Sequence, residues 1–327
     1  MKELNIAFKE FYSSIRSKRF ISLMAFYLLI TFFFNYAIKD EIINSAGQIE
    51  VSHASLSLTG AEGFITATPL SISITTNLIA LMLFGAIIGI ALGADTINRE
   101  IEEGTAKVLM SHPVYRDQVI NGKFIGNSLA LFSIIMTGYI FSIAYLLLLG
   151  VPLDGASLIR ALIAAVFTLI YMMTFLSMGI MLSTILKKPE TAMLLAIALA
   201  IFLTLIYPIT VNIAADKIAG EEPYCPPQHY EIVPGQPIQR VSHNPCPAMD
   251  EWLNKRHLWQ KRLFLLDPTH HYGQLIISAF AGDEAAQDYL PLGESLSTGF
   301  NSFAMLLVEL LLPFTIAYTR FMTSDLR

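Results

Sequence analysis

The sequence predicts an all-α membrane protein with six transmembrane helices. Hydrophobic residues make up 54% of the 327 residues and charged residues only 14%, whereas soluble domains carry about 25% charged residues. Apolar runs that are long enough to cross a hydrocarbon core of roughly 30 Å as helices occupy about residues 20–38, 71–94, 124–149, 157–186, 191–214 and 298–320. Runs of this length exclude the strands of a membrane β-barrel.

Residues 1–19 form the first predicted unit, a short amphipathic helix at the membrane surface. Apolar residues recur there at helical spacing, with Lys2, Lys9 and Arg16 set among them. This pattern is typical of a helix that lies flat on the cytoplasmic leaflet. A generic basic anchor is the alternative interpretation.

The distribution of Lys and Arg predicts the orientation. Basic residues fall in the N-terminal tail, in 98–123, in 187–190 and at the C-terminus. Six spans put these segments on one side, which the positive-inside rule makes cytoplasmic. We therefore expect a multi-pass plasma-membrane protein with both termini in the cytoplasm. The net charge of −5 then reflects external acidity, and it gives no reason to propose nucleic-acid binding.

Residues 98–123 are a polar segment between the second and third apolar runs, inside the predicted unit 20–208. Helix-forming residues fill the segment, and Gly104 and Pro113 interrupt it. A short helix at the membrane face is accessible to a soluble partner. The residues that we expect to act there are Glu100, Glu102, Glu103, Gly104, Thr105, Val108, Leu109, Met110, Pro113, Arg116 and Lys123.

The order Glu-Glu-Gly-Thr, then Leu-Met-Ser-His-Pro-Val-Tyr-Arg, then Gly-Lys resembles the cytoplasmic coupling segment of ABC-2 type (type V) ABC transporter permeases. The resemblance implies a coupling helix in 98–123 on which separate ATPase subunits dock. It also implies export as the usual direction, a dimer of this chain in the lipid membrane, and ATP and Mg²⁺ bound by the partner subunit. No cofactor is expected in the chain itself.

The chain lacks a phosphate-binding loop of its own. Its Gly122-Lys123 pair has Asp117 at the position of the required first glycine and Phe124 at that of Ser/Thr, so the chain does not match the Walker A pattern. We therefore expect no enzymatic activity. Gly85, Gly89 and Gly93 recur every fourth residue in the second run. This spacing permits close helix packing within or between subunits, and we place it near the dimer contact.

Residues 209–297 are the predicted extracellular domain, before the last helix and cytoplasmic tail at 298–327. A Pro-rich stretch at 221–247 is followed by helical patterns, with Asp267 as a candidate N-cap and Pro268 in the first turn. Cys225 and Cys246 both lie in this segment.

These two cysteines have three interpretations. A disulfide is favoured in an oxidising compartment. A zinc site with His229 and His243 is the second interpretation, because the spacing is near that of zinc ligands. Free thiols are the third, and the disulfide is the prediction, with no metal site.

Glu309 is the charged residue inside the sixth apolar run. An acid there is costly and commonly functional, although a hydrogen-bonded Glu at a helix contact is equally consistent. It supports an alternative function, a secondary transporter or channel. A non-transporting membrane sensor or scaffold with an extracellular binding domain is the other alternative.

Overall fold

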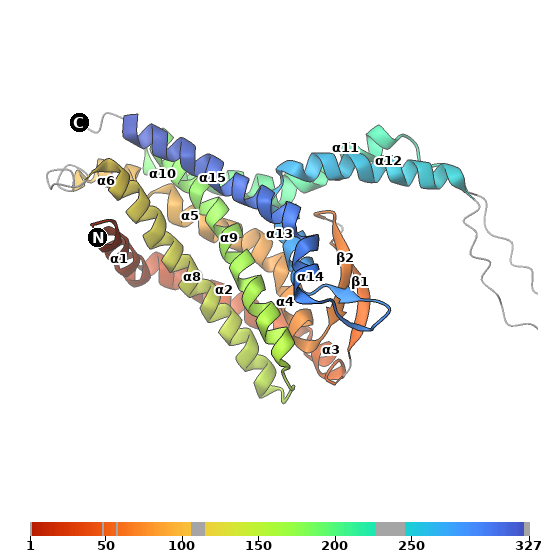
Figure 1. The fold of residues 1–327 in the computed structure, drawn as a ribbon. Helices are drawn as coiled ribbons and strands as arrows, with labels where there is room; N and C mark the ends of the chain where they lie inside the picture. The colour runs from red at the N-terminus through yellow and green to blue at the C-terminus, as the bar shows by residue number, and fades with distance from the viewer. Residues whose placement is uncertain (1, 48, 57, 106–114, 226–245, 324–327) are drawn as a thin grey trace, which may run out of the picture.

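The computed structural model describes residues 2–47, 49–56, 58–105, 115–225 and 246–323 (Figure 1). Among them are six helices that are long and apolar enough to cross a membrane, as predicted. The fold is mostly helical, and the chain is a multi-pass membrane protein. The six spans are Lys18–Ala37, Pro69–Glu102, Arg116–Leu148, Gly155–Ile185, Pro189–Ala219 and Phe300–Thr323.

The chain begins with helix α1 (Lys2–Arg16), which confirms the predicted helix but does not test its place on a membrane. Ser17 then caps α2 (Lys18–Ala37), because its hydroxyl accepts a hydrogen bond from the Phe20 amide. The short helix α3 (Lys39–Asn44) follows at the other end of α2. In Figure 1, α1 lies alongside one end of α8, far from α3.

The second span combines α4 (Pro69–Ala80), a π-helical turn (Leu81–Gly85), α5 (Ala86–Ala94) and α6 (Asn98–Glu102). Its glycines face α9 (Gly155–Ile185) of the same chain. A Cβ on Gly89 would overlap the Met172 carbonyl oxygen, and one on Gly93 would overlap that of Leu176. Close packing is therefore confirmed, but it is used within the subunit, so these two glycines are not available for the predicted dimer contact.

The remaining helices complete the bundle and the end of it that lies away from α1 (Figure 1). Span three is α8 and span four is α9. Span five runs through α10, a π-helical turn and α11, and α12 returns beside α11 and projects from the bundle (Figure 1). The bounds are α8 (Arg116–Leu148), α10 (Pro189–Ile201), η2 (Phe202–Ile206), α11 (Tyr207–Ala219), α12 (Pro247–Leu263), α13 (Pro268–Ala279), α14 (Leu292–Thr298) and α15 (Phe300–Thr323).

Two small antiparallel hairpins depart from the all-α prediction. Strand β1 (Glu50–Leu56) pairs with β2 (Ala61–Ala67), and β3 (Gly282–Asp283) pairs with β4 (Asp288–Tyr289). Gly60 has a φ of +65° in the first turn, a conformation that glycine adopts without a steric penalty. The Thr66 amide donates to the Phe280 carbonyl, so tertiary contact with the end of α13 stabilises a hairpin whose own sequence signal is weak.

Helix α13 packs inside the bundle, against α9, β2 and α15. Asp267 caps it by accepting from the Thr269 amide, with Pro268 in the first turn, as predicted. The Tyr272 ring stacks on Tyr171 of α9 with ring centroids 4.3 Å apart. The segment after span five therefore contributes a buried helix to the core of the bundle.

Candidate functional site

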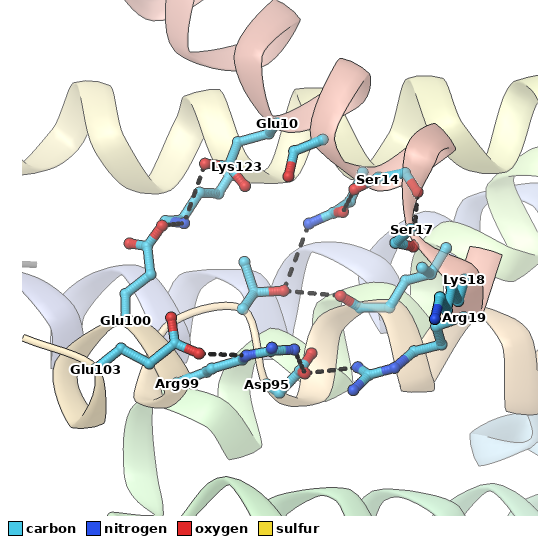
Figure 2. A pocket seen from close by; sticks show the side chains of 14 residues that line it. Glu10, Ser14, Ser17, Lys18, Arg19, Asp95, Arg99, Glu100, Glu103 and Lys123 are labelled. Atoms are coloured by element: carbon cyan, nitrogen blue, oxygen red, sulfur yellow. Dashed lines mark hydrogen bonds and ion pairs between the residues drawn. The ribbon is translucent and has the colours of Figure 1, made fainter. Parts of the chain in front are cut away.

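A polar cavity of about 490 Å³ lies where the first three spans end on the side of α1 (Figure 2). It is bounded by the C-terminal part of α1, the start of α2, the end of α5, helix α6 and the start of α8. The lining side chains are Glu10, Ser13, Ser14, Ser17, Lys18, Arg19, Leu92, Asp95, Thr96, Arg99, Glu100, Glu103, Lys123 and Asn127.

Lys123 is buried at one end of the cavity between two carboxylates. Its ammonium lies 2.7 Å from Glu100 Oε1 and 3.4 Å from Glu10 Oε1, and 2% of its side chain is exposed. A buried ammonium needs such partners, because an uncompensated charge away from water is strongly unfavourable. The lysine therefore holds α1, α6 and α8 together (Figure 2).

Asp95 organises the other end of the cavity. It ends α5 and pairs with Arg19 at the start of α2, and it lies 3.6 Å from Arg99. Arg99 also donates to Glu103 over 2.9 Å. Because these arginines and Glu103 are well exposed, each such pair contributes little stability by itself, but together they tie the start of the first span to the end of the second.

Helix α6 is fixed to α9 by a buried hydroxyl. Ser183 accepts hydrogen bonds from the Ile97 and Asn98 amides over 2.9 and 3.2 Å and donates to the Asn98 side chain over 3.1 Å. On the opposite side, Gly122 and Gly126 of α8 bring that helix against the backbone of α1. The start of residues 98–123 is thus held against α9, and the end of the segment is held against α1.

Arg116 connects the return of the segment to the last span. Its guanidinium donates to the carbonyls of Phe321 and Met322 over 3.4 and 3.2 Å. These carbonyls belong to the final turn of α15, where the helix dipole favours a positive charge. The end of 98–123 is therefore joined to the C-terminal end of α15.

The other predicted residues of the segment fall into two groups. Glu102 and Glu103 are exposed, Gly104 has a φ of +73°, and the Thr105 hydroxyl donates to the Glu100 carbonyl over 3.2 Å. The remaining predicted residues, Val108, Leu109, Met110 and Pro113, lie outside the described residues.

Glu309 lies mid-way along α15 with both carboxylate oxygens buried and without a hydrogen-bond partner among the described residues. Asp267 is its acidic neighbour and is itself fully buried. Burial raises the pKa of the Asp267 carboxyl to about 7, and hydrogen bonds from Thr269 and His270 oppose the rise. The functional role of Glu309 remains a prediction, because these contacts show an unpaired acid and no relay.

The disulfide prediction is confirmed: Cys225 and Cys246 are joined, with their Cα atoms 5.9 Å apart. Two bonded sulfurs are not thiolates, so they do not supply the ligands that the alternative zinc site needs. His229 and His243 lie outside the described residues.

Several partners of the predicted residues were not themselves predicted from the sequence. Glu10 shares a helical face with Ser13, Ser14 and Ser17, so i, i+3, i+4 and i+7 spacing was a usable signal. Arg99 follows Asp95 at i+4 spacing, but the contacts of Asp95 with Arg19 and of Ser183 with Ile97 and Asn98 carry no such signal, because these partners are distant in the sequence.

Arg160 is another missed residue, and it lies near the start of α9, at the end of the bundle away from α1 (Figure 1). It is buried at the start of α9 and donates to the Ala279 carbonyl and the Ser295 hydroxyl over 2.8 and 2.9 Å, and to the Leu290 carbonyl. Its guanidinium also lies 4.3 Å from the ring centroid of Tyr289. It joins α9 to α13, α14 and the β3–β4 hairpin.

The resemblance to known proteins covers nearly the whole chain. The family described as ABC-2 family transporter protein matches residues 4–326, which include most of α1, all six spans and the segment 98–123. Comparison with curated proteins gives no match. Since the family match spans far more than half of the chain, the protein belongs to the ABC-2 family of transporter proteins.

Proposed function

We propose that the chain is the permease subunit of an ABC transporter, driven by ATP hydrolysis in a separate nucleotide-binding subunit that docks on residues 98–123. The family match supports the permease assignment. The missing Walker A pattern is consistent with ATP and Mg²⁺ being bound by the partner.

The observation that carries this proposal is the set of contacts at the two ends of 98–123. Lys123 and Glu100 link the segment to α1 and α8, Asn98 links it to α9, and Arg116 links it to α15. A partner that displaces the segment therefore moves several helices at once. Coupling between distant sites requires a contiguous physical connection of this kind.

The roles within the segment follow from residue chemistry. Glu102 and Glu103 are exposed and available to basic groups of the ATPase, and Thr105 precedes the apolar residues Val108, Leu109 and Met110, which we assign to a groove of the partner. Pro113 ends that stretch. Arg116 and Lys123 anchor the return, consistent with their contacts inside this chain.

The proposed assembly is a dimer of this chain with two ATPase subunits in the plasma membrane, of the type V architecture. Six spans and one coupling segment make half of such a transporter. Both termini lie in the cytoplasm and substrate moves outward. The basic residues on the side of α1 support this orientation.

The test is Leu109→Asp in the reconstituted complex. A carboxylate in an apolar groove loses hydration without gaining a partner, which costs roughly 2 kcal/mol or more. We expect weaker ATPase binding, by about thirtyfold or more at this energy, with parallel loss of transport and of transport-linked ATP hydrolysis.

The matched control is Leu258→Asp on α12, at a leucine that is 49% exposed on the opposite side of the molecule. It makes the same chemical change and should leave ATPase binding intact. Wild-type ATPase binding and transport in the Leu109→Asp complex would show that 98–123 is not the docking segment.

A further inference from the structure

The polar cavity lies at the boundary between the apolar spans and the aqueous side. Ser17 caps the first span, Asp95 follows the apolar part of the second, and Lys123 precedes the apolar part of the third. All three line the cavity. This is the level at which lipid headgroups meet a membrane protein, and the volume of about 490 Å³ lies within the usual range for ligand pockets, about 300–1,000 Å³.

The charges of the cavity balance. Four carboxylates and four cationic side chains line it, and most are paired with one another. Lys18 is the exception, because no acidic group lies within ion-pair distance of it in the part of the chain that the structure describes. A balanced lining disfavours a strongly anionic or cationic ligand and favours a zwitterion.

The order of the charges along the cavity is also informative. Lys18 and Arg19 begin the first span, next to the apolar region, whereas Glu100 and Glu103 lie at the end of the second span, past its apolar part. In Figure 2 the Lys18 and Arg19 side chains are at one end and Glu100 at the other. A phosphate followed by an ammonium, read outward from the acyl chains, matches this order.

An apolar track continues from the cationic end. Ile21 and Leu29 follow Lys18 on the same face of α2 at helical spacing, and they are 51% and 65% exposed. Phe32 extends the track by another turn and is also exposed. A ligand with its polar end in the cavity can therefore lay hydrocarbon chains along α2.

We propose that this cavity binds the headgroup of phosphatidylethanolamine from the leaflet on the side of α1. The phosphate binds Lys18, the free guanidinium nitrogens of Arg19 and the Ser13 hydroxyl, while the ammonium binds the outer oxygens of Glu10 and Glu100. The acyl chains follow α2. Because the same glutamates hold Lys123, the lipid adds to the contacts at the base of 98–123. Only the name of the leaflet, cytoplasmic, rests on the proposed function.

The experiment measures lipid binding to the purified, delipidated full-length chain without any ATPase, by native mass spectrometry. The probes are phosphatidylethanolamine, phosphatidylcholine and phosphatidylglycerol with identical acyl chains, with soluble phosphoethanolamine as competitor. We expect phosphatidylethanolamine to bind most tightly, because a trimethylated ammonium donates no hydrogen bond and a glycerol headgroup carries no cation. Lys18→Gln should weaken its binding about tenfold, since one charge-assisted contact is lost.

The matched control is Lys188→Gln, which removes one exposed lysine on the same side of the protein, away from the cavity. It should leave phosphatidylethanolamine binding unchanged. Equal binding of the three lipids, tighter binding of phosphatidylglycerol, or indifference to Lys18→Gln would overturn the proposal. Displacement of the lipid by equimolar phosphoethanolamine would overturn the lipid as the source of the headgroup. None of these results depends on ATPase docking, so the proposed function can fail separately.

Discussion

Lys123 and Glu100 form an ion pair of 2.7 Å at the base of the segment 98–123, and the lysine side chain is almost fully buried. Glu10 from α1 supplies a second carboxylate to the same ammonium. The pair therefore joins a residue near the end of the second span to one at the start of the third, with the N-terminal helix as the third component.

The two carboxylates should act as mutual substitutes. Glu10→Gln or Glu100→Gln leaves Lys123 with one acidic partner, and each should cost about 1 kcal/mol of stability. The double variant leaves a buried lysine unpaired and should cost about 3–5 kcal/mol. Unfolding of the detergent-solubilised protein in a double-mutant cycle measures the excess.

The comparison variant for this cycle is Glu103→Gln, whose pair with Arg99 is exposed on both sides. It should change stability by less than about 1 kcal/mol. Strict additivity of the Glu10 and Glu100 substitutions would mean that the two carboxylates do not substitute for each other at Lys123.

Gly89→Ala should destabilise the bundle, because the added methyl overlaps the Met172 backbone. Overpacking of a helix contact costs roughly 1–3 kcal/mol, and backbone atoms have little freedom to yield. Gly85→Ala is the control, since its methyl would meet Met172 Cγ at an ordinary 3.6 Å. The melting temperature should fall for the first variant only. Equal melting temperatures of the Gly89→Ala and Gly85→Ala variants would contradict the close packing of α5 on α9.

Asp267 gives the stability a specific pH dependence. Its pKa is about 7 in the folded state, above the ordinary value of about 3.9, so the folded protein binds the proton more tightly. This contribution is complete below pH 4, declines as the pH rises through 7, and is then absent. Two buried histidines affect stability in the opposite direction. The pKa of His270 is lowered to about 4 and the pKa of His271 is also lowered, so their contributions to stability are lost as the pH falls.

Asp267→Asn isolates the acid, because asparagine keeps the N-cap and both histidines and Glu309 remain. As the pH rises from 4 to 7, the free energy of unfolding of the variant should increase relative to that of the wild type by up to about 1.4 kcal/mol per pH unit. Above pH 7 the difference should stay constant. Thermal unfolding at pH 4.5, 6 and 7.5 measures the difference. If the stability of the variant and of the wild type changed with pH in parallel, the pKa of the Asp267 carboxyl would not be perturbed by burial.

Arg160→Lys should loosen the contacts of α9 with α13 and α14 although it keeps the charge. A lysine ammonium reaches fewer of the acceptors on Ala279, Leu290 and Ser295 than the planar guanidinium does. We expect a loss of about 2 kcal/mol and faster amide exchange in α14. Arg262→Lys, at an exposed arginine of α12, should leave exchange in α14 unchanged, and equal exchange in both variants would contradict the role of Arg160.

The spans were predictable from the sequence because hydrocarbon imposes one solution, a long apolar helix, on each of them. Local signals also located the cap of α13 at Asp267 and Pro268, and the pairing of Cys225 with Cys246. The β1–β2 hairpin was missed, since its stability comes from Phe280, which is more than 200 residues away along the chain.

The candidate site was only half predictable for the same reason. Lys123 and Glu100 stand out in the sequence as charged residues between apolar runs. Their contact with α1, however, depends on Glu10, and the attachment of α6 to α9 depends on Ser183. Such contacts are set by how helices pack in three dimensions. A single sequence carries no record of which distant helix will lie beside which.

The bond from Arg116 to the last turn of α15 has a mechanical consequence. At its other end α15 follows directly on α14, which Arg160 holds through Ser295. Helix α15 thus connects the end of the bundle that Arg116 contacts with the end that Arg160 contacts. A tilt imposed at Arg116 should therefore also displace α14 at the far end of the same helix, together with the spans packed against α15.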